Sequence, residues 1–324
     1  MKKTIMIFLV LLLLTGCSTS SKTLNEDVKQ IGVVQFSEHP ALDNATKGFI
    51  QALSDNGFKD GVSIDIDKQN AQSDFGNAET IATKFVNDQK DLIFANATPV
   101  AQAVKAKTDD IPIVITSVTD PESSGLVESN TIPSNNVTGT SDLTPVKEQI
   151  ALLNNIIEDV KKVGVMYSSS EDNSLFQVDI AVKELNALNI EPVVTSVSDS
   201  TMIQSSVESL IGKVDAIYLP TDNLMAENMS SITSIAHENN IPVICGESGG
   251  VVLGSLATFG LNYYNIGYKA GEMAVEILNG KNPNEMPIEY AETGEFDFTV
   301  NKSSALQLGI DLNNEALKEA TIIE

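Results

Sequence analysis

The chain has 324 residues, too many for one ordinary α/β core and enough for about two domains. Its formal charge of −24 excludes nucleic acid as an expected partner, because phosphates need a basic surface, and argues against binding along anionic lipid headgroups. The sequence contains no arginine and no tryptophan, so a bound carboxylate would be held by hydroxyls, backbone N–H groups or helix N-termini.

The chain begins with the features of a secretory signal. Lys2 and Lys3 precede an apolar run over residues 5–14. This run is too short to cross a bilayer as a helix, which takes roughly 20 residues, and it is typical of a signal segment. It leads into a Leu-Thr-Gly-Cys sequence that ends at Cys17 and resembles the bacterial lipobox, in which the cysteine is lipidated.

We therefore expect the chain to be processed and anchored. Residues 1–16 would be the signal peptide, Cys17 the lipidated N-terminus, and residues 17–29 a flexible polar tether. The protein would then be extracytoplasmic, lipid-anchored to the outer face of the bacterial cytoplasmic membrane. An ordinary signal peptide with an incidental cysteine is the alternative interpretation.

Short apolar runs alternate with helical patterns along the rest of the chain, which indicates parallel βαβ units. Three strands expected in the first half recur in the same order in the second half. The matched segments are 30–35 with 162–167, 91–95 with 215–219, and 111–115 with 241–245. The sequence therefore predicts an α/β protein with two copies of one plan. Coincidence is the alternative, because all buried parallel strands look alike.

Helical spacing of apolar residues fills the gaps between these strands. The expected helices cover residues 45–56, 78–88, 145–158, 177–188, 227–239 and 265–278. Near the C-terminus, residues 288–300 alternate between polar and apolar and predict a further strand. The lone Cys245 ends an apolar run and is expected to be a buried small hydrophobe without a disulfide partner.

Ligands of open parallel sheets bind beyond the carboxyl ends of the strands, so the loops after each strand are the ones to examine. Several of these loops place a possible helix cap before a proline, which suits the first helical position. These pairs are His39-Pro40, Thr98-Pro99, Asp120-Pro121 and Thr144-Pro145. Each could be an ordinary cap, but helix N-termini that meet at one crevice would form an anion site without arginine.

Several stretches resemble the ABC importer substrate-binding proteins of the TrpX-like type, which have the type I periplasmic-binding fold. The most specific stretches are Ser-Asp-Leu-Thr-Pro-Val at 141–146 and Pro-Thr-Asp-Asn at 220–223, and the resemblance covers residues 30–310. It implies two Rossmann-like lobes, each a parallel sheet flanked by helices, joined by a three-segment hinge. The N-terminal lobe would comprise residues 30–141 and 262–285, and the C-terminal lobe residues 142–261 and 286–324.

The resemblance also implies a small ligand trapped between the lobes by hinge closure, an aromatic amino acid (Trp, Tyr or Phe) in some relatives. A buried zwitterion needs a partner for each of its charges. The carboxylate would be bound by Thr98 and the N–H groups after it, with Thr119 and Ser141 as further donors. The candidates for the ammonium are Glu38, Asp142, Asp222 and Glu247.

Four acids are too many for one cation, so about half of them would only cap helices or bridge the lobes. The family commonly has an Asp-Glu pair where this chain has Gly246-Glu247, which leaves Glu247 as the acid there. An aromatic side chain of the ligand would need flat apolar walls, for which the candidates are Phe36, Phe176 and Tyr263. Alternatively, each of these three belongs to the core of its lobe. The remaining expected contacts are Ala97, Asp120, Asn173, Thr221 and Asn223.

The sequence leaves alternative functions to consider: a binder of sugars or nucleosides on the same fold, a surface adhesin or sensor, and an enzyme. No enzyme is expected, because neither His39 nor His237 lies near a nucleophile motif and no strand is followed by a glycine-rich nucleotide loop. With two histidines and no paired cysteines we expect no metal site and no cofactor. The expected partners are the small-molecule ligand and an ABC permease, with the protein itself a monomer.

Overall fold

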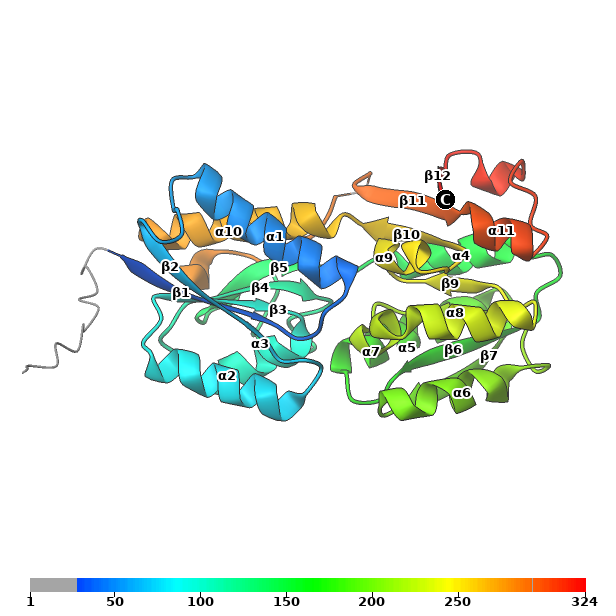
Figure 1. The fold of residues 1–324 in the computed structure, drawn as a ribbon, viewed down its shortest axis with the longest axis horizontal. Coiled ribbons are helices and arrows are strands. Elements are labelled where there is room, and N and C mark those ends of the chain that lie inside the picture. The colour runs from blue at the N-terminus through cyan, green and yellow to red at the C-terminus, as the bar shows by residue number, and fades with distance from the viewer. Residues whose placement is uncertain (1–27, 293) are drawn as a thin grey trace, which may run out of the picture.

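Two β-sheets organise the computed structural model, which describes residues 28–292 and 294–324 (Figure 1). The sheet of the first lobe has the order β2-β1-β3-β4-β5, and all its strands are parallel. Its strands are β1 (Lys29–Gln35), β2 (Ile64–Asn70), β3 (Leu92–Asn96), β4 (Ile113–Val118) and β5 (Val137–Ser141). The predicted signal peptide, Cys17 and most of the predicted tether lie outside the described residues.

The sheet of the second lobe has the order β12-β11-β10-β9-β8-β6-β7, with only β11 antiparallel to its neighbour β10 among the described strands. Its strands are β6 (Lys162–Ser168), β7 (Glu191–Val197), β8 (Ala216–Leu219), β9 (Val243–Cys245), β10 (Ala257–Leu261), β11 (Phe296–Asn301) and β12 (Thr321–Ile323). Strands β7-β6-β8-β9-β10 repeat the order of the first sheet, which confirms the predicted internal duplication.

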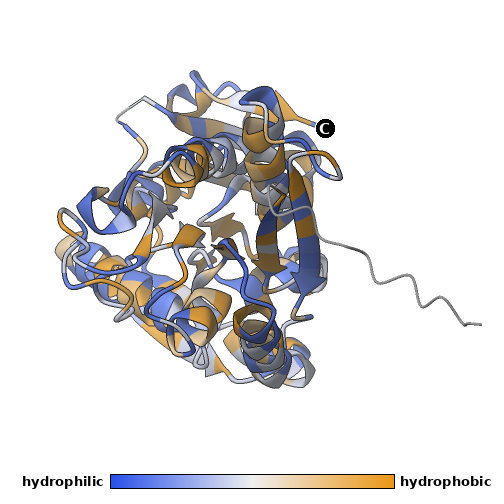
Figure 2. Ribbon diagram, turned by 90° about the vertical axis from the view of Figure 1, so that its left-hand side faces the viewer, coloured by the Kyte–Doolittle hydropathy of each residue, from blue (hydrophilic) through white to orange (hydrophobic). Residues whose placement is uncertain are grey.

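Helices cover both faces of each sheet, and Figure 2 shows them around the strands with hydrophobic and hydrophilic positions on each. In the first lobe α1 (Pro40–Asp55) and α10 (Tyr263–Leu278) pack on one face, and α2 (Phe75–Asn87) and α3 (Thr98–Lys105) pack on the other. Among the described residues, no helix is long and apolar enough to span a membrane.

In the second lobe α4, α5 and α11 cover one face, and α6, α8 and α9 cover the other. The helices of this lobe are α4 (Val146–Ile156), α5 (Asp172–Ala187), α6 (Ile203–Leu210), α7 (Asn223–Glu227), α8 (Met229–Glu238), α9 (Ser248–Val252) and α11 (Lys302–Gln307). Short 3₁₀ turns lie at Ser200–Met202, Pro283–Glu285 and Glu315–Leu317. The predicted helix over residues 227–239 begins later, because Asn228 leaves helical geometry between α7 and α8.

Helix α10 follows β10 of the second sheet but packs along α1 in the first lobe, where Figure 1 shows it beside the blue helix. Glycines allow the two backbones to touch. A Cβ atom on Gly267 would lie 2.0 Å from the Ala45 carbonyl oxygen, and one on Gly48 would lie 2.1 Å from the Tyr264 carbonyl oxygen. No larger residue fits at this approach, so the glycines fix the place of α10 in the first lobe.

The described chain passes between the lobes after β5, after β10, and between Glu289 and β11. The last crossing comes later than residue 286, where the sequence placed it. Met286 and Ile288 are buried in the core of the first lobe, and Glu289 N–H donates to the Gly139 carbonyl at 2.9 Å. The strand predicted from residue 288 is therefore wrong in its first part, because Glu289 pairs with β5 in the first lobe and β11 begins at Phe296.

Candidate ligand-binding site

A cavity lies where the two lobes meet. It has a volume of only about 10 Å³, room for about one water molecule, so an amino acid would enter only as the lobes part or side chains shift. His39, Leu42 and Ser117 of the first lobe line one side. The other lining residues are Asp142, Asn173, Thr221, Asp222, Asn223, Ala226, Glu247 and Tyr263.

Most of these residues follow the carboxyl end of a strand, where a parallel sheet is expected to bind ligands. Asp142 comes directly after β5, and Tyr263 begins α10 two residues after β10. Thr221 to Asn223 follow β8, and Glu247 follows β9. The two sheets therefore present their carboxyl ends to a common cavity.

Asp142 and Glu247 are buried carboxyl groups that face this cavity. The Tyr263 hydroxyl donates to Asp142 Oδ2 at 2.8 Å, and the Thr119 hydroxyl donates to Asp142 Oδ1 at 3.2 Å. Burial raises the pKa of Asp142 to about 6. Burial, with the Asp142 charge as a smaller cause, raises the pKa of Glu247 to about 7. Two buried acids that repel each other favour a cationic partner.

The protein supplies no such cation at the cavity. Among the described residues, none of the eleven that line it is a lysine, and the sequence contains no arginine. His39 is the one lining residue that could carry a positive charge, but burial lowers its pKa to about 4, so it is neutral near pH 7. Without a cation nearby, burial favours the protonated forms of the two acids, and a positively charged ligand would favour their ionised forms.

Asp222 also lines the cavity, but both of its oxygens are engaged in the second lobe. Oδ2 accepts from Ser168 N–H at 2.6 Å, and Oδ1 accepts from Met225 N–H at 2.9 Å as the N-cap of α7. Burial raises the pKa of Asp222 despite these bonds. Of the four predicted ammonium partners, Asp222 thus has the capping role that the sequence left open.

Glu171 is a fourth buried acid close to this region, and no sequence pattern singled it out. Its Oε1 accepts from Leu224 N–H at 3.1 Å, and its Oε2 accepts from the Asn223 side-chain amide at 2.5 Å. Burial and the neighbouring Asp222 charge raise the pKa of Glu171. Its role is to hold the start of α7 and the orientation of Asn223.

Buried polar atoms without a hydrogen-bond partner concentrate at the cavity. Within the described part of the chain they include five on lining residues: His39 Nδ1, Ser117 Oγ, Asn173 Oδ1, Thr221 Oγ1 and Glu247 Oε2. A buried polar group without a partner costs about 1–3 kcal/mol, and native proteins keep few of them. Their clustering indicates a site that is completed by a polar ligand.

Other predicted residues lie behind the cavity wall. Ser141 Oγ donates to the Thr119 carbonyl at 2.7 Å, and Thr119 in turn binds Asp142. Ala97 and Thr98 are buried at the start of α3, and Ala97 has a φ of 99°. Thr98 Oγ1 has no hydrogen-bond partner among the described residues, yet Thr98 does not line the cavity.

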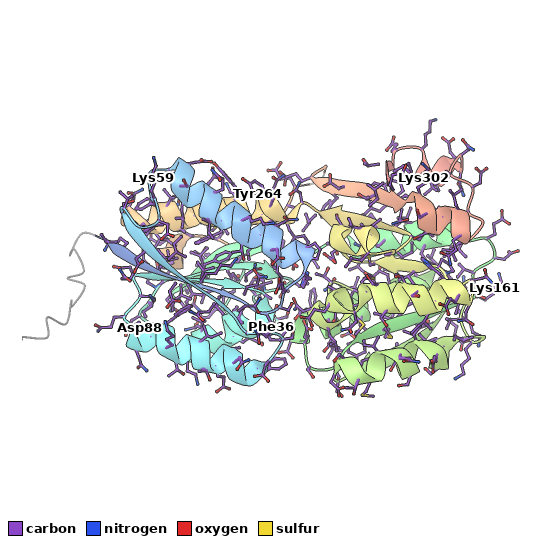
Figure 3. All side chains as sticks on the ribbon, in the orientation of Figure 1. Phe36, Lys59, Asp88, Lys161, Tyr264 and Lys302 are labelled. Atoms are coloured by element: carbon purple, nitrogen blue, oxygen red, sulfur yellow. The ribbon has the colours of Figure 1, made fainter. Side chains whose placement is uncertain are left out.

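The remaining predicted residues lie away from it. Asp120 accepts from Ser123 N–H at 2.7 Å and so caps the turn after β4. Glu38 and Phe36 line a separate groove between the lobes, where the Phe36 ring packs against Phe75, and Figure 3 shows Phe36 on the side of the first lobe next to the second. Phe176 is half-buried on α5 and does not line the cavity.

Four lining residues were not predicted to touch a ligand: His39, Leu42, Ser117 and Ala226. His39 stood out only as a possible cap before Pro40. It is the N-cap residue of α1, but its side chain makes no capping bond and reaches the second lobe instead. Ser117 has a φ of 54° at a register shift between β4 and β5, a local conformation that no sequence pattern announces.

The two lobes are in contact through side chains on either side of the cavity. His39 Nε2 lies 3.3 Å from Asn223 Oδ1, and Gln177 Nε2 donates to the Thr119 hydroxyl at 3.3 Å. Further from the cavity, the Gln102 amide donates to Asp172 Oδ2 at 2.9 Å. The structure therefore has a closed arrangement of the lobes.

Comparison with known proteins agrees with this architecture. The model of the family described as ABC transporter substrate binding protein matches residues 30–323. A tyrosine-binding protein of Clostridioides difficile (strain R20291) is 43% identical over 91% of this chain and 88% of its own length. The family and this relative are described by substrate binding and not by a catalytic activity.

Two solved structures bear on the arrangement of the lobes. An ABC domain from Streptococcus pneumonia in complex with L-Trp is 33% identical, with a TM-score of 0.88 over 92% of this chain and all of that one. The ligand-free, open structure of CD0873, a substrate-binding protein with adhesive properties from Clostridium difficile, is 45% identical over 92% of this chain and 99% of that one. Its TM-score is only 0.70.

CD0873 is more similar to this chain in sequence than the L-Trp complex is, yet it has the lower TM-score. The lower TM-score of the open structure therefore reflects a different arrangement of the lobes. A glucose-galactose binding protein from Geobacillus stearothermophilus, 16% identical with a TM-score of 0.62, shares the type I periplasmic fold alone. One assignment follows from two mainly parallel sheets flanked by helices, a cavity between them and a family match over almost the whole described chain. This chain belongs to the ABC transporter substrate-binding protein family and has the type I periplasmic-binding fold.

Proposed function

We propose that this protein binds a free amino acid with an aromatic side chain in the cavity between its lobes and delivers it to an ABC permease. One observation carries the proposal most: Asp142 and Glu247 are buried together at the cavity, and no cationic side chain lines it among the described residues. A ligand ammonium would supply the missing charge. A neutral sugar would leave both acids uncompensated.

In this proposal the carboxylates of Glu247 and Asp142 both bind the ligand ammonium. Glu247 Oε2 has no partner among the described residues and is free to accept a hydrogen bond. Asp142 already accepts from Tyr263 and Thr119, which orient its carboxylate toward the cavity. Charge-assisted hydrogen bonds of this kind are about twice as strong as neutral ones, so these two contacts would dominate recognition of the ammonium.

The ligand carboxylate is assigned to Ser117, with the start of α3 behind it. Ser117 lines the cavity, and its buried Oγ has no hydrogen-bond partner among the described residues. Ala97, the N-cap of α3, donates its N–H to the carbonyl of Thr116, which places the start of this helix beside Ser117. The N-terminal end of a helix carries partial positive charge, and this supports anion binding without arginine.

The ligand side chain is assigned to the part of the wall formed by Leu42, Ala226 and the ring of Tyr263. Tyr263 is the one predicted aromatic residue that lines the cavity. The names of the relatives support an aromatic ligand, since one is a tyrosine-binding protein and another was solved with L-Trp. Ring contacts of this kind add about 0.5–1.5 kcal/mol to the burial of apolar area.

Delivery to a permease requires the protein to stay at the membrane and to open and close. We propose lipid anchoring at Cys17 of a monomer that acts on the outer face of the cytoplasmic membrane. A ligand can drive closure only through contacts that are stronger in the closed state. In the closed state a bound ligand would add its own contacts to the hydrogen bonds that already join the two lobes. The permease would receive the closed, loaded form.

A thermal-shift screen of the purified protein tests the proposal. The probes are the twenty amino acids, together with sugars and nucleosides. A ligand present at 100 times its Kd stabilises the folded protein by about 2.7 kcal/mol, which gives a clear rise in Tm. We expect the largest rise with tyrosine, tryptophan or phenylalanine. A flat response to all amino acids with a rise for a sugar or nucleoside would refute it.

A further inference from the structure

We infer that His39 makes the site selective for amino acids whose side chain ends in a hydrogen-bond donor, so that a phenol or indole is bound in preference to a plain phenyl ring. This inference deepens the proposed function and depends on it. It rests on a chain of three buried side chains that crosses from the second lobe to the first: Glu171, Asn223 and His39.

Glu171 fixes the orientation of the Asn223 amide. Asn223 Nδ2 donates to Glu171 Oε2 at 2.5 Å, and the backbone N–H of Asn223 points at the same oxygen at 3.3 Å. With its amide nitrogen engaged in this way, Asn223 directs Oδ1 at His39 Nε2, 3.3 Å away. Because Oδ1 is an acceptor only, the proton of the imidazole must lie on Nε2.

The other ring nitrogen of His39 is then an acceptor. Burial lowers the pKa of His39 to about 4, so the ring is neutral at physiological pH and has one donor and one acceptor nitrogen. His39 is only 7% exposed and lines the cavity. Nδ1 has no hydrogen-bond partner among the described residues. A residue that lines the cavity thus carries a fixed, buried acceptor on a neutral side chain.

The surroundings of His39 show which part of the ligand reaches it. Leu42 lies one turn along α1 from His39, and Ala226 lies one turn along α7 from Asn223, and both side chains line the cavity. An ammonium would be drawn to the carboxylates of Asp142 and Glu247 instead. The apolar residues next to His39 therefore favour the ligand side chain, whose terminal O–H or N–H can donate to Nδ1.

A ligand without this donor would bury Nδ1 unpaired. Sites that hydrogen-bond a substrate hydroxyl reject the analogue that lacks it, because the site's polar group then loses water and gains no partner. For a single neutral acceptor we expect a preference on the order of tenfold in Kd. Tyrosine should therefore bind more tightly than phenylalanine, although both fit the apolar part of the wall.

The test is calorimetric titration of the purified full chain with tyrosine, phenylalanine and O-methyltyrosine, whose ether oxygen cannot donate. The wild type should bind tyrosine about tenfold more tightly than either of the other two. In His39→Leu the three affinities should become nearly equal, mainly through loss of tyrosine binding. His39→Gln keeps an amide donor for Asn223 and an acceptor for the ligand, and it should retain part of the preference.

Gln102→Ala is the matched control, because it removes a bond between the lobes away from the cavity. It should weaken all three ligands by the same factor and leave the tyrosine preference intact. If amino acids bind but the preference is absent in the wild type or survives in His39→Leu, the inference is overturned and the proposed function stands. If no amino acid binds the wild type, the proposed function and the inference both fail.

Discussion

The Tyr263 hydroxyl donates a hydrogen bond of 2.8 Å to Asp142 Oδ2, and this bond joins two crossings of the chain between the lobes. Asp142 directly follows β5 at one crossing, and Tyr263 begins α10 at another. Both side chains are buried and both line the cavity. The charge state of the proposed ammonium site is thereby coupled to the geometry of the hinge.

Removing this bond should weaken ligand binding. Tyr263→Phe keeps the ring but leaves Asp142 without its shortest hydrogen bond. Hydrogen bonds to charged groups contribute about 1.5–3 kcal/mol, so we expect a 10- to 100-fold increase in the Kd of the amino acid measured by calorimetric titration. The neighbouring Tyr264, 38% exposed, provides the control, and Tyr264→Phe should bind like the wild type. Unchanged affinity in Tyr263→Phe would contradict a role for Asp142.

The buried Glu247 should make the unliganded protein less stable as the pH rises. Its pKa is raised to about 7 in the folded protein, from an ordinary value near 4.5, so the unfolded chain loses the proton first. The stability associated with the protonated carboxyl is fully present below pH 4.5 and is lost as the pH rises through 7.

Glu247→Gln cannot ionise and should avoid this loss. Without ligand, the variant should gain stability over the wild type between pH 5 and pH 8, up to about 3 kcal/mol, measured by urea unfolding at each pH. The same substitution at the exposed Glu238 should give a difference that does not depend on pH. A variant less stable than the wild type at pH 8 would show that Glu247 has a favourable partner in the unliganded protein.

Ligand binding should release protons at pH 6. The ammonium of the ligand favours the ionised forms of Asp142 and Glu247, whose pKa values of about 6 and about 7 would both fall on binding. The affinity should therefore increase from pH 5 to pH 8. Titration calorimetry in two buffers of different ionisation enthalpy measures the number of protons released. Proton uptake, or a constant affinity over this range, would argue against the ammonium contact.

The contact of α1 with α10 should be intolerant of a single methyl group. In Gly267→Ala the new Cβ would overlap the Ala45 carbonyl oxygen, so the helices must separate. Overpacking of this kind costs about 1–3 kcal/mol, or more where backbone must move. Gly76 of α2 is the matched control, since a Cβ there meets only the Asp74 side chain, at 3.1 Å. Equal Tm values for the two variants would contradict the proposed packing constraint.

The sequence predicted the central strands because buried parallel strands are continuous apolar runs. It did not indicate the edge strands β2 and β7, where polar and half-buried residues alternate and the apolar signal disappears. The sequence also predicted one strand over residues 288–300, although the chain crosses between the lobes within this range. The alternation of polar and apolar residues does not distinguish β11 from the segment before it, where Glu289 pairs with β5. Such pairing depends on tertiary contacts, which a local pattern does not contain.

For the site, the rule that ligands lie beyond strand ends pointed to Asp142, Glu247 and Tyr263, and all three line the cavity. The same rule also selected Asp120, whose carboxylate caps a local turn, because the sequence of a cap and that of a ligand contact are alike. Ser117 was missed, since its place in the cavity depends on a backbone irregularity at the end of β4.

The central claim is that Asp142 and Glu247 together bind the ammonium of an amino acid. The most direct measurement compares, by calorimetric titration of the wild-type protein, the best amino acid from the screen with its desamino analogue, which keeps the carboxylate and the side chain. Leaving a buried charge without its partner costs about 3–5 kcal/mol, so the analogue should bind at least about 100-fold more weakly. Equal affinities for the two compounds would contradict the claim.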